Sequence, residues 1–160
     1  RRFLVNNEDW RSKVILSEDF SQAYLNSNID EWTVRIRIID NNQAYITLKS
    51  SLNGFTSYEF EYQIPIQDAI ELFNLSKHKI TKTRYQLKID RKDWVVDSFK
   101  GLNSSLTIAE IELNSESEQI QIPAWCEKEI TGIKSLSNAS LAKKPISELS
   151  ISDRIKTKDT

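Results

Sequence analysis

Residues Trp32–Ile39 read WTVRIRII, and their alternation of polar and apolar side chains decides the fold class. Arg35 and Arg37 fall on one face of the expected strand, while Val34, Ile36 and Ile38 fall on the other. This follows because successive side chains of a strand point to opposite faces. The stretch therefore predicts a β-strand with one apolar side and one side that carries two guanidinium groups.

The same period of two recurs along the chain and predicts a mainly β protein. Strands are expected at five further stretches: residues 44–50, 56–63, 79–89, 94–99 and 106–113. The pair Asn53-Gly54 lies between two of these stretches and is typical of a tight hairpin turn. Helical spacing of apolar residues is strongest at Pro65–Asn74, with weaker helices expected at 136–144 and 146–151. We expect one antiparallel β domain with a few covering helices.

Three of these other strands also carry two charges of one sign at positions i and i+2. The pairs are Glu59 with Glu61, Lys82 with Arg84, and Glu110 with Glu112. Each strand aims two like charges at one place, which is unfavourable unless opposite charges face them. Two arrangements satisfy this condition. One is a solvent-exposed sheet face with cross-strand ion pairs; the other is a closed barrel of about eight strands with charged faces inside and helices covering the apolar faces outside.

Composition excludes several classes of function. The chain has 160 residues, with 22 basic and 23 acidic side chains and a formal net charge of −1, so it lacks the basic excess of an ordinary duplex DNA-binding domain. The single Cys126 excludes an internal disulfide and a cysteine-based zinc cluster, and the single His78 excludes a histidine-rich metal site. No apolar run approaches membrane-span length, and no leader pattern is present. These features predict a cytoplasmic protein that binds neither membranes nor nucleic acid, and they allow a homodimer.

A barrel lined by these charge pairs has a definite chemistry. Guanidinium and ammonium groups in the lumen would bind a polyanion through charge-assisted hydrogen bonds. Carboxylates in the same lumen would hold Mg²⁺ or Mn²⁺, which prefer oxygen ligands. The combination suits a metal-bound polyphosphate, in which cations neutralise the oxygens and a bound water attacks phosphorus.

An ordered set of short motifs resembles one known family. In chain order the motifs are RRFLV, VRIRI, ITLK, YEFEY, KTRY, VDSF, AEIEL, Pro123-Ala124-Trp125, Glu129-Ile130-Thr131, Ser137-Asn138 and Leu141-Ala142. This order resembles the CYTH domain, also called the triphosphate tunnel metalloenzyme superfamily, from residue 1 to about residue 145. The resemblance implies a mainly β (α+β) fold, a closed eight-stranded antiparallel β-barrel whose charged tunnel binds a triphosphate with a divalent metal. We expect the domain to span residues 1–151 and residues 152–160 to form a disordered tail.

The resemblance also implies roles for individual residues. Phosphate-binding cations are expected at Arg2, Arg35, Arg37, Lys49, Lys82 and Arg84. Carboxylates associated with the metal and its waters are expected at Asp97, Glu110 and Glu112. Further tunnel carboxylates are expected at Glu59 and Glu61. Lys82 is also the expected proton acceptor for the attacking water, if its neighbours Arg84 and Lys49 lower its pKa.

The chain departs from the family pattern at several positions. The family signature begins Glu-x-Glu-x-Lys, whereas this sequence starts just after the second glutamate would occur and has Arg2 in place of the lysine. Those two glutamates are usually metal ligands, so they either lie upstream of Arg1 or are missing. The absence of any methionine favours a true start upstream. Ser57 stands where an arginine is common, which is expected to weaken or redirect substrate choice, and Leu136 stands where a tyrosine is common.

Within the family, the short form of the domain that this chain resembles, with its RRFLV start and its EITGIKSLSN ending, is most similar to bacterial inorganic triphosphatases. The resemblance therefore implies divalent-metal-dependent hydrolysis of a triphosphate, above all inorganic tripolyphosphate, with Mg²⁺ or Mn²⁺. Two alternatives stay open. A class IV-like adenylate cyclase would use the ribose 3′-hydroxyl of ATP as nucleophile and would need an adenine pocket, which no motif marks. A non-catalytic module that binds polyphosphate or nucleotide is favoured if the amino-terminal glutamates are truly absent.

Overall fold

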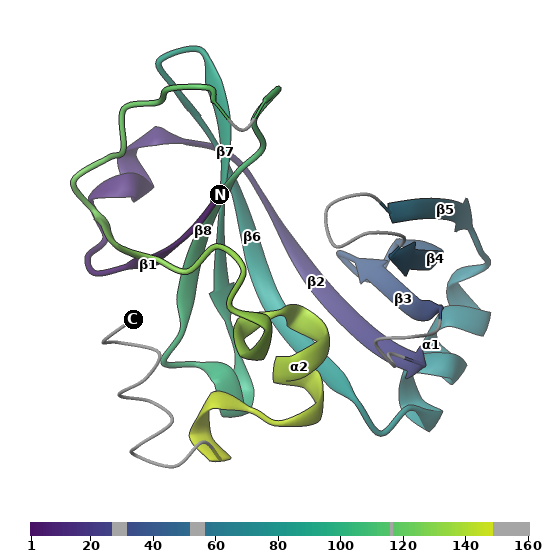
Figure 1. Ribbon diagram of the computed structural model, residues 1–160. Helices are drawn as coiled ribbons and strands as arrows, with labels where there is room; N and C mark the ends of the chain where they lie inside the picture. The colour runs from purple at the N-terminus through teal and green to yellow at the C-terminus, as the bar shows by residue number, and fades with distance from the viewer. Residues whose placement is uncertain (27–31, 52–56, 116, 149–160) are drawn as a thin grey trace.

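Nine antiparallel strands form a single sheet in the described part of the chain, which comprises residues 1–26, 32–51, 57–115 and 117–148 of a computed structural model (Figure 1). The strands are β1 (Arg2–Val5), β2 (Val14–Asn26), β3 (Thr33–Ile39), β4 (Gln43–Ser51), β5 (Ser57–Gln63), β6 (Lys79–Ile89), β7 (Lys92–Phe99), β8 (Thr107–Ile111) and β9 (Cys126–Glu129). Their order across the sheet is β5-β4-β3-β2-β6-β7-β8-β1-β9. The mainly β class predicted from the sequence is confirmed.

Short helices connect and cover the strands. They are α1 (Ile66–Leu75), α2 (Asn138–Lys143), and the 3₁₀ turns η1 (Asp9–Lys13), η2 (Gly101–Asn103), η3 (Lys134–Leu136) and η4 (Ile146–Glu148). The six predicted strands correspond to β3 to β8, and the predicted helix at Pro65–Asn74 corresponds to α1. The helix expected at 136–144 is shorter and begins at Asn138, and η4 occupies the start of the last predicted helix. The predicted Asn53-Gly54 turn and the predicted tail at 152–160 lie outside the described residues.

The closed eight-stranded barrel is not confirmed. Among the described residues the sheet has nine strands and ends in two edges, β5 and β9, which no backbone ladder joins. β9 is only four residues long, and the chain beyond it turns into η3 and α2. These two elements pack on the inner side of the curved sheet (Figure 1), so they occupy space that a closed lumen would need at this end.

Apolar side chains on the outer face of the sheet form two separate cores. One lies under α1 and consists of Ala23, Ile36, Ile38, Ala44 and Ala69. The other lies under η1 and the segment that precedes β9, and consists of Phe3, Trp10, Leu87, Trp94, Val96, Ala109, Ile111 and Trp125. Ile36 and Ile38 of the WTVRIRII stretch are therefore buried on the outer face, beneath α1, which leaves Arg35, Arg37 and Ile39 on the inner face.

The outer face of β5 differs from the expectation that helices cover all the bulky apolar side chains. Trp94 is buried, as expected, but Tyr58, Phe60 and Tyr62 are 56 %, 45 % and 57 % exposed. β5 lies at the edge of the sheet, beyond the strands that α1 covers, so no described helix covers these three rings, and among the described residues only Phe60 has a further ring, that of Trp32, at 6.0 Å on this face.

A third core lies on the inner face and fixes α2 there. Tyr24, Ile80, Phe99 and Ile108 project from four strands toward Leu136, Leu141 and Ala142 of η3 and α2. Ser137 caps α2, because its hydroxyl oxygen accepts a hydrogen bond from the backbone N–H of Ser140 (3.2 Å). The inner face is therefore apolar near α2 and charged beyond it.

The described helices include none that is both long enough and apolar enough to cross a lipid bilayer.

Candidate functional site

Strand register brings ten of the predicted site residues to one face of the sheet. Arg35 lies opposite Tyr24 and Thr47, Lys82 lies opposite Phe20, and Arg84 lies opposite Asp97. The register of β1, β4 and β5 brings further predicted site residues to the same face at the two ends of the sheet. We call the resulting set the charged face: Arg2, Arg35, Arg37, Lys49, Lys82, Arg84, Glu59, Glu61, Asp97 and Glu110. It holds six cations and four carboxylates.

Asp97 is the centre of the charged face. Its Oδ2 accepts hydrogen bonds from Lys82 Nζ (2.5 Å) and Arg84 Nη2 (2.7 Å), and its Oδ1 accepts one from Arg84 Nε (2.8 Å). The side chains of Asp97 and Lys82 are each 1 % exposed. Although burial opposes ionisation, the charges and hydrogen bonds of Lys82 and Arg84 hold the pKa of Asp97 below its usual value. Burial lowers the pKa of Lys82 to about 8, against the attraction of Asp97.

Two further ion-pair groups flank this centre. On the β8 side, Arg2 Nε donates to Glu110 Oε1 (2.9 Å) and Arg2 Nη2 donates to the carbonyl oxygen of Leu136 (3.0 Å). On the β5 side, Arg35 Nη2 donates to Thr47 Oγ1 (2.9 Å) and Glu61 Oε2 (3.3 Å). The Nε of Arg35 is buried and has no hydrogen-bond partner within the described residues. That nitrogen is a donor held in place for an acceptor that the described chain does not supply.

At the outer end of this side, Lys49 Nζ and Glu59 Oε2 lie 3.4 Å apart, and Arg35 Nη2 lies 3.9 Å from Glu59 Oε1. Both Lys49 and Glu59 are exposed, with side chains 53 % and 44 % accessible. The charged face therefore opens to solvent at β4 and β5 and is buried at β6 and β7. Its exposed part resembles the solvent-facing sheet with cross-strand ion pairs, and its buried part resembles the charged interior of a barrel, the two arrangements that the sequence left open.

Arg37 lies between these groups without a counter-charge. It forms no ion pair with any described carboxylate; its Nε donates to Gln22 Oε1 (2.9 Å), and its guanidinium lies 5.1 Å from the centre of the Phe20 ring. Burial, followed by the like charges of Arg35 and Arg84, lowers the pKa of Arg37 to about 10. An anion bound here would relieve that repulsion, so Arg37 marks the point where the charged face needs a ligand.

Sequence reasoning missed the contribution of β2. Phe20, Gln22 and Tyr24 alternate along this strand and point to the charged face, where Phe20 lies within about 6 Å of Lys82, Arg37 and Arg84. Burial raises the pKa of Tyr24 to about 12, so the phenol stays neutral. β2 carries no charge pair, and its two faces mix polar and apolar residues, which hides the period of two. The i, i+2 spacing of Phe20, Gln22 and Tyr24 is the signal that remains.

Thr47 and Asn138 are also part of the site. Thr47 is buried, accepts from Arg35 and donates from its Oγ1 to Glu61 Oε2 (2.8 Å), which fixes both charged groups. Asn138, the first residue of α2, accepts a hydrogen bond at Oδ1 from Lys82 Nζ (3.1 Å). Neither residue carries a charge, so the search for charge pairs could not find them.

The three carboxylates predicted to hold a metal do not assemble into a ligand group. Both oxygens of Asp97 are bonded to cations, Glu110 pairs with Arg2, and Glu112 lies exposed one residue beyond β8. In residues 1–26, 32–51, 57–115 and 117–148, no three His, Cys, Asp or Glu side chains form a group that could hold a metal ion. The side chains described here therefore do not by themselves fit Mg²⁺ or Mn²⁺.

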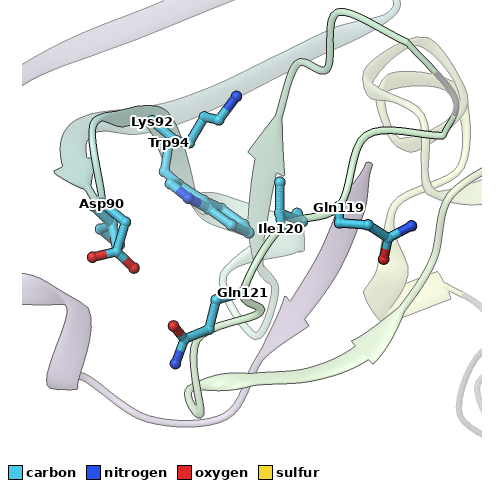
Figure 2. Close-up of a pocket in the computed structure, with 7 residues that line it drawn as sticks. Asp90, Lys92, Trp94, Gln119, Ile120 and Gln121 are labelled. Atoms are coloured by element: carbon cyan, nitrogen blue, oxygen red, sulfur yellow. The ribbon is translucent and has the colours of Figure 1, made fainter.

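Two pockets lie away from the charged face. Asp90, Lys92, Trp94, Gln119 and Gln121 are among the residues that line a cavity of about 260 Å³ beside the β6–β7 turn (Figure 2). Trp94 belongs to the outer core, so this cavity is on the opposite side of the sheet from Asp97. A second pocket, of about 340 Å³, is lined by Trp32, Leu48, Phe60 and Tyr62 on the outer face of β4 and β5. No predicted site residue lines either pocket.

This fold agrees with the comparisons with known proteins. The profile of the CYTH domain matches residues 1–145, and the chain belongs to the CYTH domain family. It is similar to an inorganic triphosphatase of Acetivibrio thermocellus, with 34 % identity over 149 residues that cover 91 % of this chain and 92 % of that protein.

Solved structures support the same assignment. The crystal structure of the inorganic triphosphatase NE1496 matches with a TM-score of 0.69 and 28 % identity, and the match covers 89 % of this chain and 94 % of that chain. The PH1012 protein from Pyrococcus horikoshii OT3 matches with a TM-score of 0.54 and 22 % identity over 71 % of this chain and 77 % of that chain, which shows a shared fold.

The burial of the Lys82–Asp97 pair predicts a large effect on stability. Asp97→Asn should lower the free energy of unfolding by about 3–5 kcal/mol, because it leaves the Lys82 ammonium buried without its counter-charge. Asp93→Asn is the matched control on the same strand, because the Asp93 side chain is 83 % exposed and pairs with the half-exposed Lys88. It should change stability little. Urea unfolding at pH 7 measures both variants, and equal losses would show that the charged face does not depend on Asp97.

Proposed function

We propose that this protein hydrolyses inorganic tripolyphosphate, bound on the charged face, to pyrophosphate and orthophosphate. The observation that carries the proposal is Arg37, a partly buried guanidinium between Arg35 and Arg84 with no carboxylate partner among the described residues. The unpaired Nε of Arg35 supports it. The family assignment and the similarity to inorganic triphosphatases favour a triphosphate over other polyanions.

The roles of the cations follow from their positions. Arg37 and Arg84 lie near the Phe20 ring, and Arg35 lies opposite Tyr24 on the same face. All three would donate to the phosphate oxygens, with Arg2 and Lys49 reaching from the two sides. Guanidinium groups suit this task because their planar donors match two oxygens of one phosphate. They would stabilise the negative charge that shifts to the bridging oxygen as the P–O bond breaks.

Lys82 is proposed to accept the proton of the attacking water. The water oxygen bonds to the terminal phosphorus, the bridging P–O bond breaks, and pyrophosphate leaves with the bond's electron pair. A lysine with a pKa of about 8 can take that proton near neutral pH, which a lysine with an ordinary pKa cannot do. Because Lys82 is 1 % exposed, water has to reach Nζ on the side that Asp97 and Asn138 do not occupy.

The metal belongs to the proposal as an expectation from family resemblance. We propose Mg²⁺ or Mn²⁺ as cofactor, with Asp97, Glu110 and Glu112 as the carboxylates that the family resemblance associates with the metal and its waters, and with Glu59 and Glu61 as further carboxylates of the charged face. Because the described side chains do not form a metal-ligand group, no step of the proposed reaction is assigned to the ion. A cytoplasmic location and a homodimer stay predictions from the sequence.

A non-catalytic module that binds polyphosphate or nucleotide is the second candidate. The observation that favours it is the state of the four carboxylates on the charged face, all of which contact cations in the structure. The adenylate cyclase alternative gains less support. The aromatic pocket at Trp32, Phe60 and Tyr62 lies on the outer face of the sheet, opposite Glu59 and Glu61, so it does not offer adenine a place beside the cations.

The products decide between these candidates. With Mg²⁺ or Mn²⁺, the protein should convert tripolyphosphate to pyrophosphate and orthophosphate faster than it releases orthophosphate from ATP, and it should make little cyclic AMP. Phosphorus-31 NMR of the reaction mixture measures all three. Cyclic AMP as the main product from ATP would establish a cyclase, and tight binding of tripolyphosphate without turnover would establish a binding module.

Arg37 should matter far more than an arginine outside the charged face. Arg37→Gln should lower turnover of tripolyphosphate by about 10²–10³-fold, the cost of removing one donor that stabilises transition-state charge. Arg91→Gln, in the exposed turn between β6 and β7, should leave turnover unchanged. Steady-state kinetics with melting temperatures for both variants provides the comparison. A similar loss of turnover in the two variants would show that the charged face has no special part in the reaction.

A further inference from the structure

The Lys82 ammonium is held from two sides. Its Nζ donates to Asp97 Oδ2 at 2.5 Å and to Asn138 Oδ1 at 3.1 Å. The rings of Phe20 and Phe99 lie 6.0 Å and 5.4 Å from Nζ and offer it no oxygen. Because the side chain is 1 % exposed, bulk water cannot replace a missing acceptor at full strength. Among the described residues, Asn138 Oδ1 is therefore the one neutral oxygen that accepts a hydrogen bond from Lys82 Nζ beside Asp97.

The position of Asn138 does not depend on Lys82. Leu136, Leu141 and Ala142 anchor η3 and α2 in the inner core, and the hydroxyl of Ser137 caps the helix. An ammonium group only donates hydrogen bonds, so the Asn138 amide must present its oxygen to Lys82. The core therefore fixes the acceptor, and the acceptor fixes the ammonium.

The same segment reaches a second cation of the charged face. The carbonyl oxygen of Leu136 accepts from Arg2 Nη2 at 3.0 Å, two residues before Asn138. Two neutral acceptors from residues 136–138 thus contact two of the six cations, on strands that lie on different sides of β7 and β8. This pattern is unexpected if α2 merely covers apolar surface.

We infer that Asn138 is a positioning residue, whose amide oxygen holds the side-chain nitrogen of Lys82 beside Asp97 in the place that the proposed hydrolysis requires. The inference rests on the proposed function. Asn138 does not replace any of the guanidinium donors, so its loss should affect the chemical step more than substrate binding. A residue that only stabilised α2 would not separate these two effects.

Kinetics of two variants of matched size test the inference. Asn138→Leu keeps the branched shape and the number of side-chain heavy atoms but removes the acceptor. It should lower kcat about 10–100-fold, as losses of supporting hydrogen bonds do, with KM changed less than about threefold. Asn138→Asp keeps an oxygen within reach of Nζ, but its carboxylate favours the protonated form of Lys82 and repels the anion. It should therefore retain most of kcat only at a more alkaline pH optimum, where kcat is compared, and it should have a higher KM. Equal losses of kcat in the two variants would overturn the inference.

Ser137→Ala provides the structural control. It removes the cap of α2 without touching Lys82, so it should lower the melting temperature while kcat stays near that of the unaltered protein. If Ser137→Ala and Asn138→Leu lower kcat to the same extent, Asn138 acts only through the stability of α2.

A spectroscopic readout separates this inference from the proposed function. In protein labelled with ¹⁵N-lysine, without metal or tripolyphosphate, the Lys82 ammonium protons should exchange slowly with water. Asn138→Leu should speed that exchange, because one N–H loses its acceptor, and Asn138→Asp should not. Unchanged exchange in Asn138→Leu would contradict the inference even if the protein is an active triphosphatase. Faster exchange in a protein that does not hydrolyse tripolyphosphate would uphold the contact and reject the proposed function.

Discussion

The buried contact of Asp97 with Lys82 and Arg84 is the interaction on which the rest of the charged face depends. Six cations on one face of a sheet repel one another, and most of them are partly shielded from water. Asp97 offsets two of these charges at the most buried point, and it holds Arg84 through both Nε and Nη2. Without this carboxylate, the strands β6 and β7 would bring uncompensated charge into a low-dielectric environment.

The ion pairs of the charged face become more exposed to solvent with distance from Asp97. Asp97 and Lys82 are fully buried, Arg2 and Glu110 are partly covered, and Lys49 and Glu59 are open to solvent. Arg37 is the exception, since it is partly buried without a carboxylate partner among the described residues and its pKa falls to about 10. A face with more cations than carboxylates inside a chain of net charge −1 is built to receive an anion.

The sequence predicted the strands that carry charge pairs and could not predict how the sheet ends. Arg35 with Arg37, and Lys82 with Arg84, identified their strands because like charges two residues apart have a strong pattern. β2 lacks such a pattern, although it supplies Phe20, Gln22 and Tyr24 to the site. Closure of the sheet depends on whether its two edge strands pair. The alternation of side chains within one strand carries no information on such a distant pairing, so the sequence pattern could not decide whether the barrel is closed. Asn138 was missed for a similar reason, because its partner lies 56 residues away in the sequence.

The most direct test of this account is the position of bound tripolyphosphate. A crystal structure of the full chain with tripolyphosphate, in the presence of a chelator that removes divalent metals, would show it. The account predicts phosphate oxygens within hydrogen-bond distance of Arg37 and of the Nε of Arg35, with Asp97 still bonded to Lys82 and Arg84. Tripolyphosphate bound elsewhere, for example at the outer pocket beside Lys92, with Arg37 left without an anion, would contradict it.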